Sequence, residues 1–113
     1  MLPKENRLTK NKEFEKVFKE GRAAYQGLLG IKCIKNGLAI SRFGILIGIK
    51  VSKKAVERNK VKRRIREIIH LHLNEIAPGY DCSCYCLKPI ISKEYEEIEI
   101  AVIACLKRLK LIK

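Results

Sequence analysis

The residues most suited to chemistry in this chain form one basic segment, from Lys50 to Arg66. Nine of its 17 residues are Lys or Arg, and only Glu57 is acidic. Arg presents a planar fork of donors that fits a phosphate group, and Lys presents a compact positive charge. Such side chains at close spacing suit a polyanion with regularly spaced phosphates. We therefore expect this segment to bind nucleic acid.

An amphipathic helix must position these basic side chains. Apolar residues interrupt them at helical spacing, namely Val56, Val61, Ile65, Ile68 and Ile69, and this pattern predicts a helix from about Ala55 to Ile76. The arc that faces a core would hold Val61, Ile65, Ile68, Ile69, His72 and Ile76. The opposite side would hold Asn59, Lys60, Lys62, Arg63, Arg64 and Arg66, with Arg58 at the boundary. Pro78-Gly79 would end the helix.

A solvated helix face is the alternative interpretation of these charges. Only Glu57 and Glu67 could form stabilising pairs with them. Arg58, Lys62 and Arg66 form a row of like charges at i,i+4 spacing, which repel each other. Because this arrangement does not stabilise an isolated helix, the pattern favours a bound polyanion.

Composition leads to the same expectation. The chain of 113 residues has the length of one domain, and its 25 Lys+Arg against 12 Asp+Glu give a net charge of +13. Self-repulsion of this size is best offset by nucleic acid, with an anionic membrane surface or no partner as alternatives. The sequence shows neither an apolar stretch of about 18 residues nor a secretory signal, so we expect a cytoplasmic location and no membrane association.

The cysteines could suggest a metal site. Cys82, Cys84 and Cys86 are two residues apart, whereas structural zinc sites use pairs separated by two to four residues. A spacing of two is the period of a β-strand and points all three thiols to one face. Together with Cys33 and Cys105, they are best explained as reduced, buried apolar residues. Zinc binding, a disulfide or a redox role are the alternatives.

Two histidines raise the question of catalysis. His70 would face outward and His72 inward on the long helix, so they cannot act as a pair. The carboxylates do not cluster either, because Asp81 is the only Asp and several Glu residues lie at the start of the last helix. We therefore predict no catalytic side chain and no metal ligand in this chain.

The remaining pattern predicts one sheet covered by helices. A first helix would begin after Thr9 or Asn11, carry Phe14, Val17 and Phe18 on one face, and end at Gly21. Strands are expected at Leu28–Ile34, Phe43–Val51 and Tyr80–Leu87, and a last helix from Ser92 to about Lys110. The predicted order is α-β-β-α-β-α, in which the first β region forms two strands or three. This is a single α+β sandwich domain spanning residues 1–113.

The basic segment also resembles a family signature. Residues 55–67 read AVERNKVKRRIRE, and the protein subunit of bacterial ribonuclease P carries A-V-x-R-N-x-x-K-R-x-x-R-E. The N-terminal pattern from Arg7-Leu8 to Gly21-Arg22, the turn Pro78-Gly79-Tyr80-Asp81 and the helix around Leu106–Leu109 are similar to the same family. The resemblance covers the chain from about Asn6 to Leu109.

This resemblance implies a fold and a partner. The fold would be α-β-β-β-α-β-α with a left-handed βαβ crossover, like domain 2 of ribosomal protein S5. The protein would join a catalytic RNA that removes the 5′ leader of precursor tRNA, using Mg²⁺ bound mainly by the RNA, without an obligate protein partner. The implied RNA-binding residues are Arg58, Asn59, Lys60, Lys62, Arg63, Arg64 and Arg66, together with Lys53 and Lys54 just before the signature.

The resemblance further implies a cleft for the single-stranded leader, lined here by Phe14, Phe18, Lys32 and Lys50. Aromatic faces combined with positive charge suit single-stranded RNA. Ordinary core packing is the alternative for Phe14 and Phe18. This chain has Lys32 where the family often has an aromatic residue in the first strand, which favours a phosphate contact there.

Two other functions compete with this one. The first is a general binder of structured RNA, such as a ribosome-associated protein without an enzyme partner. The second is a free-standing metallonuclease that uses the cysteines or histidines.

Overall fold

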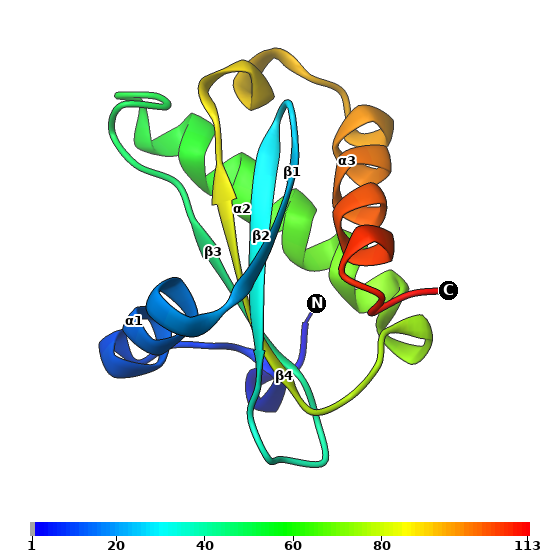
Figure 1. Cartoon of the computed structure of the whole chain (residues 1–113). Coiled ribbons are helices and arrows are strands. Elements are labelled where there is room, and N and C mark those ends of the chain that lie inside the picture. Colours follow the sequence, from blue (N-terminus) through cyan, green and yellow to red (C-terminus); the bar gives the residue numbers. More distant parts are fainter. Residues whose placement is uncertain (1) are drawn as a thin grey trace.

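The computed structural model of the protein describes residues 2–113. Its helices and strands follow the order α-β-β-β-α-β-α (Figure 1). They are α1 (Asn11–Glu20), β1 (Arg22–Gln26), β2 (Leu29–Lys35), β3 (Arg42–Leu46), α2 (Ala55–Leu71), β4 (Tyr80–Cys86) and α3 (Tyr95–Arg108), with short 3-10 turns η1 (Lys4–Asn6), η2 (Leu73–Glu75) and η3 (Lys88–Ser92). The α+β class is confirmed, and the first β region forms three strands.

The four strands form one mixed sheet in the order β1-β2-β4-β3. The pairs β1/β2 and β2/β4 are antiparallel, whereas β3 and β4 are parallel. Helix α2 connects this parallel pair. In Figure 1 it passes behind the sheet while the chain moves from β3 on the left to β4 on its right, with both strands running upward. The crossover is therefore left-handed, the opposite of nearly all βαβ units.

The core lies between the sheet and helices α2 and α3. Alternate residues of each strand point into it, and the sheet contributes Leu29, Ile31, Cys33, Phe43, Ile45, Cys82, Cys84 and Cys86. All five cysteines are free and buried, and Cys82, Cys84 and Cys86 all contribute to the core from β4, as their strand period predicted. Burial raises the pKa of the Cys82 thiol well above its ordinary value, so this thiol stays protonated and behaves as an apolar group.

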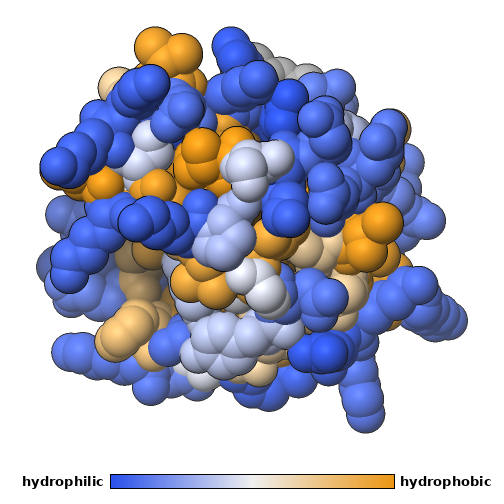
Figure 2. All heavy atoms as spheres, turned by 90° about the horizontal axis from the view of Figure 1, so that it is seen from above, coloured by the Kyte–Doolittle hydropathy of each residue, from blue (hydrophilic) through white to orange (hydrophobic). Residues whose placement is uncertain are grey.

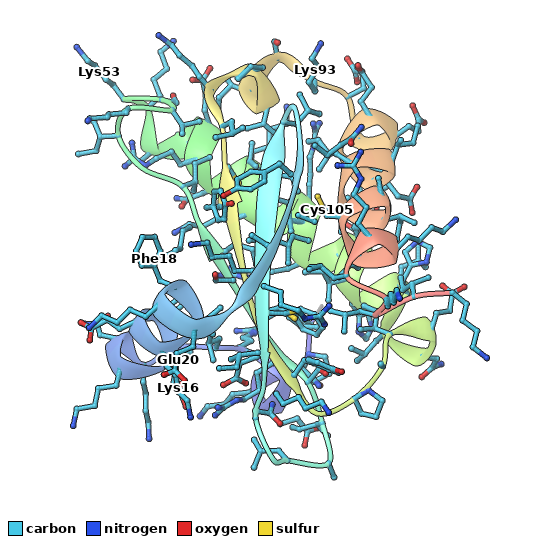
Figure 3. The ribbon with its side chains drawn as sticks, viewed as in Figure 1. Lys16, Phe18, Glu20, Lys53, Lys93 and Cys105 are labelled. Atoms are coloured by element: carbon cyan, nitrogen blue, oxygen red, sulfur yellow. The ribbon has the colours of Figure 1, made fainter. Side chains whose placement is uncertain are left out.

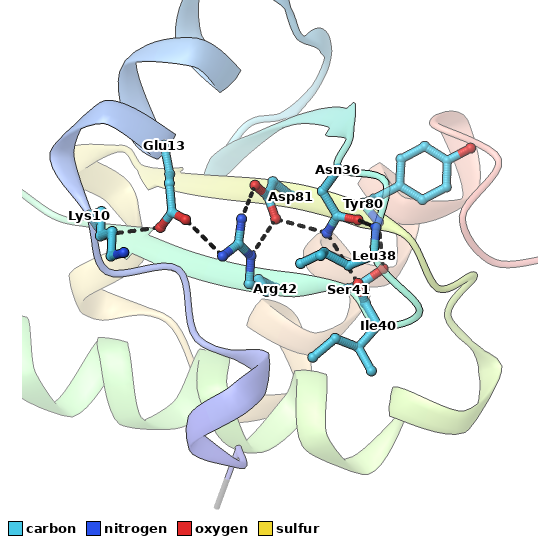
Figure 4. A network of polar contacts seen from close by, with 9 residues as sticks. All are labelled: Lys10, Glu13, Asn36, Leu38, Ile40, Ser41, Arg42, Tyr80 and Asp81. Carbon is cyan, nitrogen blue, oxygen red and sulfur yellow. Dashed lines mark hydrogen bonds and ion pairs between the residues drawn. The ribbon is translucent and has the colours of Figure 1, made fainter.

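Helix α1 lies on the other face of the sheet and is held there by Arg42. Its guanidinium pairs with Glu13 of α1 at 2.7 Å and with the buried Asp81 of β4 at 2.7 Å (Figure 4). Asn36 donates a further hydrogen bond of 2.9 Å to Asp81. The chain just before α1 is also tied to the sheet, because the Leu8 N–H donates to the Phe43 carbonyl.

The edge strand β1 is fastened to α3. Arg108 donates a 2.7 Å hydrogen bond to the Tyr25 carbonyl oxygen, and Arg22 donates one of 3.2 Å to the Leu109 carbonyl oxygen. The backbone of β1 is thus held by β2 on one side and by arginine donors on the other.

Two predicted elements extended five residues too far. Helix α2 ends at Leu71 rather than Ile76, because the chain turns at His72 (φ −102°, ψ 9°) into a 3-10 turn. Ile76 is still buried, so the apolar spacing continued without the helix. Strand β3 ends at Leu46 rather than Val51, and Ile49 lies 68% exposed in the turn that follows.

Helix starts also differ from prediction. Helix α1 is capped by Lys10, not Thr9 or Asn11, and Glu13 accepts from the Lys10 N–H. Helix α3 begins at Tyr95 rather than Ser92, with reciprocal capping between Glu94 and Glu97. The last helix ends at Arg108 rather than Lys110. In both α1 and α3, the carboxylate at the third helical position caps the first turn and so sets where the helix starts.

Candidate nucleic-acid interface

The first part of the candidate interface is the outer face of α2, called here the basic face. It consists of Arg58, Asn59, Lys60, Lys62, Arg63, Arg64 and Arg66, all partly or fully exposed. The opposite side of the helix buries Val61, Ile65, Ile68 and Ile69 against the core, as predicted. Val56 is the exception, because it is 80% exposed at the first turn.

The charges of the basic face are not consumed by acidic neighbours. Within residues 2–113, no Lys or Arg of α2 forms a salt bridge, and the nearby Glu57 instead accepts a 2.5 Å hydrogen bond from Ser52. Arg58 and Arg64 donate to the carbonyl oxygens of Ser52 and Lys93, which orients them without neutralising them. The face is therefore free to pair with phosphates.

A shallow hollow of about 280 Å³ lies along the C-terminal half of α2. Its lining includes Arg63 and Arg66, with Glu67, His70 and Leu71 beside them. Two arginines thus contribute to one concave surface, and guanidinium groups pair well with phosphate oxygens.

The second part is a cleft between α1 and the sheet, with a volume of about 350 Å³. Its lining consists of Phe14, Phe18, Tyr25, Lys32, Leu46, Ser83 and Tyr85. Phe18 is 69% exposed, so it is not a core residue, whereas Phe14 is partly buried. The structure thus brings together three of the four residues predicted for the cleft, Phe14, Phe18 and Lys32.

Two glycines let aromatic rings lie directly on the sheet. A side chain at Gly44 would collide with the Phe14 ring. One at Gly30 would come within 2.5 Å of the Tyr85 ring. The floor of the cleft is therefore formed by aromatic faces packed on bare backbone.

Lys32 supports the helix that walls the cleft. Its ammonium group lies 4.0 Å from the centroid of the Phe18 ring and donates a 3.2 Å hydrogen bond to the Phe18 carbonyl oxygen. The ring and the positive charge are thereby held side by side at the cleft mouth.

Lys50 does not line the cleft, contrary to the prediction. It lies exposed beyond the end of β3, in the loop that also carries Lys53 and Lys54. Lys53 points outward at the upper end of the molecule (Figure 3), and seen from above this end shows mostly hydrophilic side chains around smaller apolar patches (Figure 2). The three lysines extend positive charge from the basic face around the loop.

Sequence reasoning missed Tyr25, Leu46, Ser83 and Tyr85. Tyr25 pairs with Gly30, Gly30 with Tyr85, and Tyr85 with Leu46, so these residues form one row across the sheet. The period-two alternation of β4 could have placed Tyr85 opposite the buried cysteines. Tyr25 lay in a strand that the residue pattern did not separate.

The two histidines lie in different surroundings within the described residues. His70 is exposed, and His72 lies between Glu75 (2.5 Å) and Glu99 (2.9 Å). Hydrogen bonds to Glu99 and Glu75 raise the pKa of His72 above 6.5. Among residues 2–113, no group of three or more His, Cys, Asp or Glu side chains is placed to hold a metal ion. In the same range, no helix combines the length and apolar character needed to cross a membrane.

Known proteins are similar to this chain in sequence and in fold. The family model described as Ribonuclease P matches residues 2–110. A ribonuclease P protein component from Clostridium botulinum (strain 657 / Type Ba4) is 40% identical over 106 residues, covering 93% of this chain and 95% of that protein. The RNase P protein of Staphylococcus aureus superposes with a TM-score of 0.88 at 27% identity, covering 96% and 98% of the two chains. That of Thermotoga maritima superposes with a TM-score of 0.83 at 30% identity, covering 90% and 96%.

Proposed function

Because the chain belongs to the ribonuclease P protein family and serves as the protein subunit in tRNA 5′ processing, we propose how its two surfaces divide the work. The basic face of α2, extended by the lysines of the 47–54 loop, binds the catalytic RNA. The cleft beneath α1 binds the 5′ leader of precursor tRNA. The chain is thus part of an endoribonuclease holoenzyme whose chemistry is carried out by the RNA, with the protein working in the cytoplasm and without an obligate protein partner.

The observation that carries this proposal is the unpaired charge of α2. A row of like charges on a folded helix is unfavourable in the free protein. It becomes favourable when phosphates approach, because each neutralised phosphate also releases a condensed counterion. A partner RNA with closely spaced backbones supplies that compensation.

The cleft supports the second half of the proposal. Phe14 and Phe18 offer ring faces, and Lys32 places a positive charge next to Phe18. Grooves that combine stacking with charge bind single strands with little preference among bases. A leader strand has these properties, whereas the folded body of tRNA presents few unstacked bases.

We propose that Mg²⁺ is held mainly by the RNA. Side chains of this chain would act through position and charge, by offsetting repulsion between RNA strands and keeping the leader in register. When bound, the ion would supply Lewis-acid chemistry at the scissile phosphate.

Reconstitution tests the main proposal. Adding the protein to a ribonuclease P RNA at low magnesium should restore cleavage of precursor tRNA at the 5′ end of the mature sequence. Unchanged cleavage would instead favour a general binder of structured RNA. Cleavage by the protein alone, abolished by chelation, would favour a metallonuclease.

Phe18→Ala tests the leader cleft within that holoenzyme. Since Phe18 is 69% exposed, its removal should leave the core intact and weaken precursor tRNA binding several-fold more than mature tRNA binding. Ile100→Ala, which truncates a side chain that is 65% exposed on α3, is the matched control. Phe14→Ala tests the same surface but also removes the ring packed over Gly44. Equal losses for both tRNAs would return the phenylalanines to a purely structural role.

A further inference from the structure

We infer that Tyr25 is a stacking platform for one leader nucleotide, held in place by Tyr85. This inference rests on the proposed function of the cleft and deepens it. It assigns base stacking to Tyr25 of β1, with Tyr85 of β4 as its support, on a sheet whose β2 strand contributes Lys32 to the cleft.

Tyr25 lies in the cleft beside Tyr85. Tyr25 and Tyr85 lie in one cross-sheet row with Gly30 between them, and both line the cleft. Phe14 and Phe18 wall the same cleft from α1. A leader RNA strand that passes the phenylalanines and continues along the sheet would therefore reach the two tyrosines next.

The Tyr25 ring is exposed to solvent and is supported by the Tyr85 ring. Tyr25 is 56% exposed, a large fraction for an aromatic side chain with a neighbour to pack on. Its ring meets the Tyr85 ring edge-to-face, with centroids 5.7 Å apart and planes at 69°. This contact braces Tyr25 from one side and leaves ring surface open to the cleft.

The backbone of β1 around Tyr25 is held in place by α3. Arg108 donates a 2.7 Å hydrogen bond to the Tyr25 carbonyl oxygen, and the Cys105 thiol lies 3.6 Å from the carbonyl oxygen of the adjacent Ala24. An edge strand would otherwise move easily, so these contacts fix the backbone that carries the ring. A pre-positioned aromatic ring loses little freedom when a base stacks on it.

Tyr85 is placed to support a neighbouring ring rather than to contact RNA. Its ring lies directly against Gly30, and its hydroxyl is buried without a hydrogen-bond partner among the described residues. Burial raises the pKa of this hydroxyl well above its ordinary value, so it remains neutral. Tyr85 therefore acts as an uncharged support, whereas the exposed ring of Tyr25 makes the contact.

Lys32 provides charge rather than a stacking surface. Because its ammonium group is engaged with the ring and carbonyl of Phe18, it cannot stack on a base. The positive charge of Lys32 thus lies beside Phe18, and the Tyr25 ring adds a separate stacking surface to the cleft.

The test uses the holoenzyme, formed from the full chain and ribonuclease P RNA, with fluorescent precursor tRNA and mature tRNA as ligands. Tyr25→Ala should weaken precursor tRNA binding by about 5- to 100-fold and leave mature tRNA unaffected, as expected for one lost base–aromatic stack. Tyr25→Phe should restore most of the binding, because the ring face is retained. Ile100→Ala, at an exposed residue of α3 outside the cleft lining, controls for surface truncation.

A series of leaders with a single abasic nucleotide locates the contact. One abasic position should weaken binding to the wild-type protein but add nothing to the loss caused by Tyr25→Ala. If wild-type holoenzyme shows no preference for precursor over mature tRNA, the proposed leader cleft is wrong and the platform with it. If that preference persists undiminished in Tyr25→Ala, the platform alone is refuted. Similar losses with both tRNAs would also refute it.

Discussion

Replacing Lys60 and Arg63 together by Gln should flatten the salt dependence of RNA binding. Both side chains are exposed on α2, and neither has a hydrogen-bond or salt-bridge partner within residues 2–113. They are therefore the basic-face residues whose charge is most available to RNA. Arg58 and Arg64 are poorer choices because each also ties α2 to a backbone carbonyl.

The size of the effect follows from counterion release. Each lost phosphate contact lowers the log–log slope of affinity against salt by about 0.7 to 0.9, so two contacts give about 1.4 to 1.8. If both proteins converge near 1 M salt, the variant should bind about 15- to 30-fold more weakly at 0.15 M salt. Folding stability should be unchanged or rise by a few tenths of a kcal/mol, because repulsion between neighbouring charges is relieved.

The assay is equilibrium binding of ribonuclease P RNA across a series of salt concentrations, with thermal unfolding as a check on the fold. Lys107→Gln with Lys113→Gln removes the same charge near the C-terminus and should leave the slope close to that of the wild type. An unchanged slope for the α2 variant would refute the assignment of phosphate contacts to the basic face. The same loss in the control would show that only net charge matters.

Two further predictions concern stability. Hydrogen bonds to Glu99 and then Glu75 raise the pKa of His72 above 6.5, so its stabilising contribution is fully present below that value and disappears as pH rises through the raised pKa. The difference in urea midpoint between wild type and His72→Gln should therefore be larger at pH 5.5 than at pH 8.5, and a constant difference would contradict this. Arg42→Met should lower the free energy of unfolding by about 2 to 3 kcal/mol at pH 7, because it leaves the buried Asp81 without its charged partner. A loss below about 1 kcal/mol in urea unfolding would show that the pair matters little.

The sequence predicted those parts of the fold where spacing is strong. The apolar arc of α2 and the alternating cysteines of β4 identified the core correctly, because each pattern repeats over several residues. Boundaries were less accurate, since Ile49 and Ile76 continue an apolar pattern that the backbone no longer follows. Strand β1 could not be separated from the residues alone, because RAAYQ has only one buried position, Ala24.

The candidate site divides in the same way. The basic face lies on one helix, so its composition was readable from local spacing. The cleft depends on register, because Tyr25 and Tyr85 meet only when three strands align on Gly30. Lys50 was misplaced because β3 ends at Leu46, five residues earlier than the predicted end at Val51.

Both edge strands of the sheet, β1 and β3, are partly covered, which affects how the free protein behaves in solution. On one side Arg108 occupies a β1 carbonyl, and on the other the N-terminal segment bridges β3 at Phe43. Exposed strand edges are templates on which further chains can add and aggregate. Both edges of the sheet are partly occupied, and the highly cationic molecules repel one another. Newly made copies can therefore stay dispersed until they bind RNA.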